Sequence, residues 1–209
     1  MEIFDSTKRG LFELLKDVHN GKIQLPDFQR GWIWDDNRIK GILASVAKSF
    51  PIGAIMLLET GNENVKFKTK LVEGVKQNGD LKPELLILDG QQRITSLYQT
   101  IISDEIVTTR NEKNYEIKRW YYIDMEKAMD DSFDIEDAII SVNEKKQITE
   151  DFGRRIVLDL SKKEYEFKNL MYPVCMIDNY SNWRREFNEH WHYEREKSIF
   201  WDKFEDRII

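Results

Sequence analysis

Apolar residues recur along this chain with two periods, and the change from one period to the other outlines its elements. Spacings of three to four residues predict helices over residues 6–20, 35–50 and 90–103. Ser6 can cap the first of these, and a short acidic helix is expected at 126–131. Apolar or alternating runs predict strands at 22–26, 52–59, 84–89, 118–125 and 137–142.

Beside the strand at 52–59, three further segments complete the pattern. Residues 52–59 are expected to form a buried strand, and 65–72 an exposed strand of a hairpin. Residues 154–161 read as a strand or as the start of a helix. Residues 179–209 are aromatic and charged and contain no Pro or Gly, which predicts one or two amphipathic helices.

This order of elements predicts an α+β domain at residues 1–178, with a mixed sheet flanked by helices. Residues 179–209 would be a helical extension, the start of a region that continues in longer proteins. Its aromatic residues are expected to pack against a downstream domain or against a second copy of the chain in a homodimer, because the interleaved acids would repel a phosphate backbone.

Composition narrows the classes of function. The chain has 209 residues, a net charge of −6 and one cysteine, Cys175. A single cysteine allows neither an internal disulfide nor a thiolate metal cluster, and favours the reducing cytoplasm. An acidic chain lacks the general basic field of proteins that grip duplex DNA, although charge is local and a basic site is compatible with it. No apolar stretch approaches the ~18 residues of a membrane span, and no signal peptide is evident.

The stretch LILDGQQRITSLYQTI, residues 86–101, carries the first candidate site. A buried strand ends at Asp89, Gly90 permits a tight turn, and a helix begins at Gln91. Free amides at a helix start bind anions, and Arg93 adds a fork that matches phosphate oxygens. Asp89 is then a candidate for binding Mg²⁺ or orienting a water, while one of Gln91 and Gln92 faces a ligand. The alternative is structural, with Asp89 as a helix cap paired to Arg93.

The stretch LPDFQRGWIW, residues 25–34, repeats this chemistry. As an extended segment it would place Phe28, Arg30, Trp32 and Trp34 on one face, with Gln29 on the other. A tryptophan near a guanidinium is typical of a wall for a base, so Trp32 or Trp34 could cover one. In the alternative, the tryptophans fill the core and Arg30 pairs with Asp27 or Asp89, or the two stretches meet and brace each other.

Together these stretches resemble the N-terminal domain of GmrSD-type restriction endonucleases, a family known by its DGQQR motif. The resemblance rests on an ordered pattern through residues 25–59, which includes Pro-Ile-Gly, followed by DGQQR at 89–93. It covers residues 1–102 strongly and the rest more loosely. It implies a ParB/sulfiredoxin-like nuclease fold.

The resemblance also implies a role in defence against phage. Members are linked to binding and hydrolysis of a nucleoside triphosphate, GTP or UTP, and commonly precede an HNH nuclease domain that cuts modified DNA. By this resemblance, the nucleotide chemistry would fall to the five motif residues, with Gln29 and Arg30 beside them and Mg²⁺ as the expected ion. DNA would be reached only through a complex with the nuclease domain or subunit.

This chain departs from multidomain members in having no HNH region. Its histidines are His19, His190 and His192, and the last two are spaced too closely to form a metal pair on one helix face. No Walker-type phosphate loop is present. The leading expectation, which the resemblance implies, is a sensor domain that binds a nucleotide, with or without hydrolysing it. Asp89, Gln92 and Arg93 would be its catalytic residues. Two rivals stay open: a DNA phosphodiesterase that uses the same residues, and a module that binds a nucleotide or DNA end without catalysis.

Overall fold

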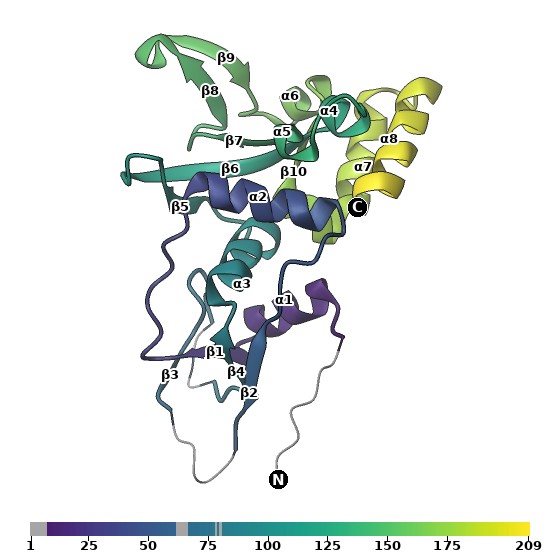
Figure 1. The fold of residues 1–209 in the computed structure, drawn as a ribbon. Helices are drawn as coiled ribbons and strands as arrows, with labels where there is room; N and C mark the ends of the chain where they lie inside the picture. Colours follow the sequence, from purple (N-terminus) through teal and green to yellow (C-terminus); the bar gives the residue numbers. More distant parts are fainter. Residues whose placement is uncertain (1–7, 62–66, 78, 80) are drawn as a thin grey trace.

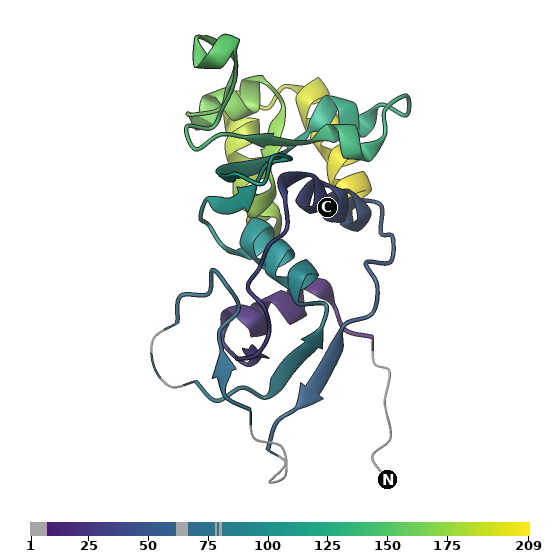
Figure 2. The same cartoon turned by 60° about the vertical axis from the view of Figure 1, so that its left-hand side comes forward.

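Two sheets lie towards opposite ends of the molecule, and helices α2 (Asp36–Ala47) and α3 (Gln91–Leu97) lie between them (Figure 1). The computed structural model describes residues 8–61, 67–77, 79 and 81–209. Figure 2 shows α3 running from the lower sheet towards the upper one. Because α3 continues directly into a π-helix, Tyr98–Ile102, this central rod is longer than α3 alone.

The lower sheet carries the motif turn. Its strand order is β2-β4-β1-β3, with β4 parallel to β1 and antiparallel to β2. Its strands are β1 (Ile23–Pro26), β2 (Met56–Glu59), β3 (Thr69–Lys70) and β4 (Leu85–Asp89). The expectation of a buried strand at 52–59 is wrong in part: the strand begins at Met56 and lies at the edge of the sheet, where its side chains are half-buried or exposed. Of the hairpin expected at 65–72, residues 65 and 66 lie outside the described part.

The upper sheet is antiparallel and is built around β6. Its strands are β5 (Val107–Arg110), β6 (Glu116–Asp124), β7 (Ile139–Val142) and β10 (Met171–Pro173). A separate hairpin projects beyond it, formed by β8 (Gln147–Glu150) and β9 (Arg155–Asp159). Residues 154–161 are therefore largely a strand.

The helices start where acceptors can satisfy their first amides. Asp35 caps α2, and Asp124 and Asp134 cap two short helices beside the upper sheet. The other helices are α1 (Leu11–His19), α4 (Met125–Met129), α5 (Ile135–Ala138), α6 (Lys163–Lys168), α7 (Tyr180–His190) and α8 (Arg195–Ile208). Helix α1 begins at Leu11 with Gly10 at its N-cap, and the expected cap Ser6 lies outside the described residues.

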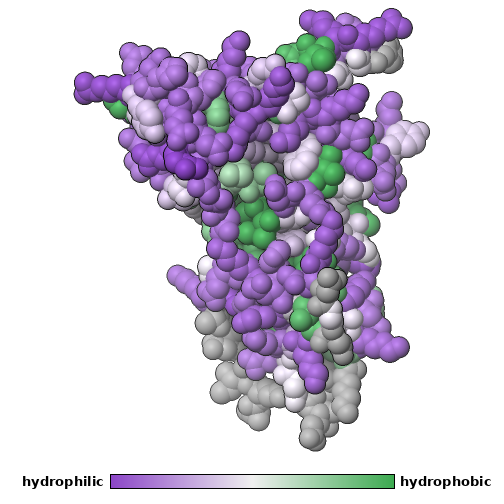
Figure 3. Space-filling model, turned by 180° about the vertical axis from the view of Figure 1, so that it is seen from behind, coloured by the Kyte–Doolittle hydropathy of each residue, from purple (hydrophilic) through white to green (hydrophobic). Residues whose placement is uncertain are grey.

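The β8–β9 hairpin packs on a small cluster around Tyr122, Val142 and Leu160, and one main hydrophobic core joins the helices to most strands of both sheets. It extends from Leu14 in α1 to Phe204 in α8. Trp183, Phe187 and Trp201 are fully buried in it, so the aromatic face of the C-terminal helices packs within the chain itself. Seen from behind, the surface is largely hydrophilic, and hydrophobic side chains appear only in limited groups (Figure 3). None of the helices in the described part of the chain is long and apolar enough to span a bilayer.

These features confirm an α+β fold in which sheets, one of them mixed, are flanked by helices and followed by a helical C-terminal part. The strands divide into two sheets and a hairpin, whereas the sequence indicated one mixed sheet. The ParB/sulfiredoxin-like assignment and the boundary at residue 178 stay predictions.

Candidate functional site

The motif turn joins β4 to α3. Gly90 has a φ of +91°, which L side chains rarely adopt. A Cβ on Gly90 would also lie 3.1 Å from Cγ1 of Ile55 and 3.3 Å from Nη2 of Arg93. The turn is therefore both left-handed and crowded, and it directs the first amides of α3 outward, where no intrahelical acceptor reaches them.

Residues 29–33 lie across this turn, held by three glutamine side chains. Gln29 Nε2 donates to the carbonyl of Leu88 at 3.0 Å, and Gln91 Nε2 donates to that of Arg30 at 2.7 Å. Gln92 accepts from the amide of Ile33 at 2.9 Å and donates to the carbonyl of Gly31 at 3.2 Å. The two stretches singled out in the sequence therefore meet and brace each other.

Arg93 connects the turn to the α2–β2 loop. Its guanidinium donates to the carbonyls of Ile52 at 2.7 Å and Ala54 at 2.9 Å, and to Oδ2 of Asp89 at 3.1 Å. A guanidinium has five N–H donors, so donors are left for a ligand. The side chain keeps 22% of its surface exposed, so it is not sealed inside the protein.

A cavity of about 240 Å³ opens beside this turn. It brings together the site residues expected from the sequence: Gln29, Arg30, Trp34, Asp89, Gly90, Gln91, Gln92 and Arg93, together with Leu88. Arg30 is exposed, and its guanidinium has no hydrogen-bond or ion-pair partner among the described residues. The side chain of Asp89 is 71% exposed. A cation without a partner among the described residues and an exposed carboxylate therefore share one cavity.

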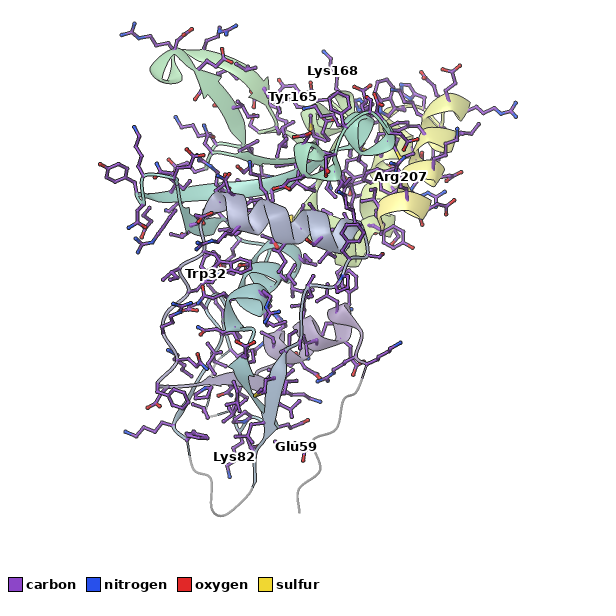
Figure 4. All side chains as sticks on the ribbon, in the orientation of Figure 1. Trp32, Glu59, Lys82, Tyr165, Lys168 and Arg207 are labelled. Atoms are coloured by element: carbon purple, nitrogen blue, oxygen red, sulfur yellow. The ribbon has the colours of Figure 1, made fainter. Side chains whose placement is uncertain are left out.

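The two tryptophans differ in their roles. Trp34 lines the cavity, but Trp32 does not. Trp32, labelled in Figure 4, instead donates from Nε1 to Oγ of Ser96 in α3 at 3.0 Å. The expected shared face of residues 28–34 does not form, because the amide of Gln29 donates back to the carbonyl of Pro26 and turns the chain.

A metal ion at this cavity would have few protein ligands. The described residues contain no group of three or more His, Cys, Asp or Glu side chains that could hold an ion. The single accessible carboxylate of Asp89 fits a magnesium ion that takes its remaining ligands from phosphate oxygens and water. Whether Asp89 binds a metal stays a prediction.

The side candidates of the sequence lie elsewhere. Burial raises the pKa of Cys175 to about 11, which suits a core thiol and not a nucleophile. His19 contacts the hydroxyl of Tyr98 through Nδ1 at 3.1 Å, and His190 packs on Phe167. Lys146 pairs with the buried Glu166 at 3.5 Å.

Sequence reasoning missed two residues that shape the site. Gly53, with a φ of +89°, leaves room for the Arg93 guanidinium, and only the Pro-Ile-Gly sequence hinted at it. Glu73 accepts from the amide of Trp32 at 2.9 Å, and its Oε2 is buried with no hydrogen-bond partner among the described residues. Glu73 comes from a polar stretch without periodicity, so no pattern pointed to it.

Comparison with known proteins identifies the family of this chain. Residues 11–202 match the family described as the GmrSD restriction endonuclease, N-terminal domain. The uncharacterized protein MJ0686 of Methanocaldococcus jannaschii is 31% identical over 203 residues, which cover 90% of this chain and 32% of that protein. The chain therefore spans about a third of the length of that relative. Because the family match covers both sheets and α7 and reaches into α8, this chain belongs to the GmrSD restriction endonuclease N-terminal domain family.

Proposed function

We propose that this domain binds a nucleoside triphosphate, GTP or UTP, in the cavity around Asp89, and acts as the nucleotide sensor of a restriction system. The supporting observation is that one cavity collects Arg30, which has no partner among the residues that the structure describes, the spare donors of Arg93 and the start of α3. All three present N–H groups, and a polyphosphate supplies the oxygen acceptors that such donors need.

The side chains divide into binding and positioning roles. Arg30 and Arg93 would bind phosphates, the amides after Gly90 would cradle them, and Trp34 would form the wall next to the base. Gln91 and Gln92 would position the loop, because their amide groups already bond to Arg30, Gly31 and Ile33. Magnesium would neutralise phosphate charge next to Asp89. Hydrolysis would in addition need a water in line with the terminal phosphate.

The phosphodiesterase alternative has less support. Two-metal phosphodiesterases use several protein ligands that hold the ions about 3.5–4 Å apart. Asp89 alone would require further ligands from a substrate or partner. We therefore propose that DNA cleavage belongs to an HNH nuclease domain or subunit, and that this domain reports nucleotide occupancy to it. A sensor that binds without hydrolysis is the second form of the proposal.

Titration calorimetry with each of the four nucleoside triphosphates and Mg²⁺ tests the binding. Arg30→Ala should weaken GTP or UTP binding at least about tenfold, since a hydrogen bond to a charged group contributes about 1.5–3 kcal/mol. This variant is a cleaner probe than Arg93→Ala, because Arg93 also holds the α2–β2 loop. Arg185→Ala, an exposed arginine on α7, should leave the affinity unchanged.

Three results decide the outcome. Absence of heat with every nucleotide would refute the proposal, and so would equal losses in Arg30→Ala and Arg185→Ala. A phosphate-release assay on the nucleotide that binds then separates hydrolysis from binding alone.

A further inference from the structure

A second and larger cavity, of about 350 Å³, lies where the start of α2 meets the β5–β6 hairpin. Asp35, Asp36, Asn37, Arg110, Asn111, Glu112, Lys113, Ile117 and Arg119 line it. The hairpin projects from the body of the molecule beside the first turn of α2 (Figure 1). A β-bridge between Asp35 and Arg110 fixes the two elements to each other.

The carboxylates of this cavity already have donors. Asp36 accepts from the Tyr121 hydroxyl at 2.9 Å and the Ser141 hydroxyl at 2.7 Å. Asp35 accepts from the amide that follows in the first turn of α2, at 2.9 Å. Glu112 accepts from Nδ2 of Asn37 at 3.2 Å. Each of these acids therefore already accepts at least one hydrogen bond inside the protein.

The cations of the cavity are in the opposite situation. Among the described residues, Arg119 donates only to the carbonyl of its neighbour Lys118, at 3.2 Å, and Arg110 donates only within its own hairpin, to Asn114 at 3.0 Å. The ammonium of Lys113 has no partner among the described residues, and none of the three cations forms an ion pair with a described carboxylate. Since Arg has five N–H donors and Lys three, most donors of these three cations have no acceptor among the described residues.

We infer that this cavity binds a phosphodiester group in the backbone of a nucleic acid strand. A phosphate is rich in acceptors and lacks donors, which complements the spare N–H groups of Arg110, Lys113 and Arg119. The positive end of the α2 dipole meets the same space. Ile117 is the single apolar residue of the lining, and no aromatic residue is present in it, so the cavity offers no wall for stacking a base. Contacts of this kind position a nucleic acid without reading its sequence.

The position of the cavity suits a strand that passes the nucleotide site. Trp34 lines the first cavity and Asp35 the second, so the segment from Arg30 to Asp35 connects them. The Cα atoms of Arg30 and Asp35 are at most about 18 Å apart along an extended chain. The domain would thus contribute a backbone contact of its own inside a nuclease complex, although its net charge of −6 keeps that contact weak in isolation.

Fluorescence anisotropy with the full chain and a fluorescein-labelled 20-base-pair duplex tests the inference. In about 50 mM salt, we expect binding in the range of about 10⁻⁶ to 10⁻⁴ M that is typical of backbone contacts. Lys113→Glu should weaken it at least about fivefold and lower the salt slope by about one. Lys113 is exposed, so the fold should tolerate the change; Arg119→Gln is the second variant, with circular dichroism to verify folding.

Matched controls locate the effect. Lys168→Glu makes the same charge change at the upper edge of the molecule (Figure 4) and should alter the affinity less than twofold. Lys113→Glu should leave the affinity for GTP or UTP in calorimetry unchanged, which separates this inference from the proposed nucleotide site. Equal losses in Lys113→Glu and Lys168→Glu, or no duplex binding by the wild type, would overturn the inference. It would also fail if GTP titrates this cavity in calorimetry while the duplex does not.

Discussion

The guanidinium of Arg93 lies in the first turn of α3, where the helix dipole disfavours a cation. Two carbonyls of the α2–β2 loop and the carboxylate of Asp89 offset that cost. The same contacts explain Gly53, because any side chain at that position would enter the space of the guanidinium. One residue therefore holds three segments around the candidate cavity.

Gly53→Ala should lower the free energy of unfolding by about 1–3 kcal/mol, through backbone strain at a φ of +89° and collision with Arg93. Urea denaturation measures this. Gly41→Ala is the matched control: Gly41 lies inside α2, where an added methyl group would make only an ordinary contact, 3.8 Å from Oε1 of Glu136, so the change should be neutral or stabilising. In an Arg93→Ala background the cost at Gly53 should shrink. An equal cost in both backgrounds would show that Arg93 plays no part in it.

At the scale of elements, a buried carboxylate ties the upper sheet to the C-terminal helices. Glu166 of α6 accepts from the Tyr122 hydroxyl of β6 at 2.8 Å and lies 3.5 Å from Nε1 of Trp183 in α7. Lys146, in the β7–β8 turn, lies 3.5 Å from the carboxylate and over the Trp120 ring. Burial raises the pKa of Glu166 by more than the contacts with Tyr122 and Lys146 lower it. The net effect favours the protonated form.

This raised pKa predicts a pH dependence with a definite sign. The folded chain binds the Glu166 proton more tightly than the unfolded chain, so the contribution to stability is complete below pH ~4.3 and is lost as the pH rises through the raised pKa. Glu166→Gln cannot ionise, and its stability relative to the wild type should increase between pH 4 and 7. Urea denaturation at each pH measures the difference. Glu164→Gln, exposed on the same helix, should show no such trend, and a flat difference for Glu166→Gln would contradict the assignment.

At the scale of the whole molecule, the C-terminal helices share their core with the sheets. Trp183 stacks on Phe187 with ring centroids 5.3 Å apart. The ring centroid of Tyr172 in β10 lies 4.9 Å from that of Trp183 and 5.6 Å from that of Trp201. These residues belong to the same cluster as Ile94 of α3. Because the cluster is continuous, we expect one cooperative unfolding unit.

Trp201→Ala should therefore destabilise regions far from α8. Removing a large buried aromatic side chain costs about 3–5 kcal/mol. Native-state hydrogen exchange should show equal reductions in peptides from α3 and from α7. Ile199 is partly exposed on the same helix, so Ile199→Ala should lower the free energy of exchange in the α3 and α7 peptides by less than about 1 kcal/mol. Loss of protection limited to residues 180–208 would instead show that the extension unfolds on its own.

The sequence by itself determined the main elements and the location of the site. Apolar periodicity over 35–50 and 90–103 was enough for α2 and α3, since both bury a regular face. The glycine in DGQQR marked the turn, because glycine adopts a left-handed backbone at little cost and other residues rarely adopt it. Short elements such as α5, α6, β5, β8 and β10 were missed, because fewer than about seven residues rarely establish a period.

Only the tertiary structure decided what each polar side chain does. Gln91 and Gln92 look alike in the sequence as candidate ligands, yet their amides hold residues 30–33, which are about sixty positions away in the chain. Within the described part of the chain, the carbonyls of a remote loop reach the guanidinium of Arg93, whereas no side chain or carbonyl pairs with that of Arg30. Hydrogen-bond partners of this kind are set by chain packing over long sequence separations, which local pattern and residue type do not encode.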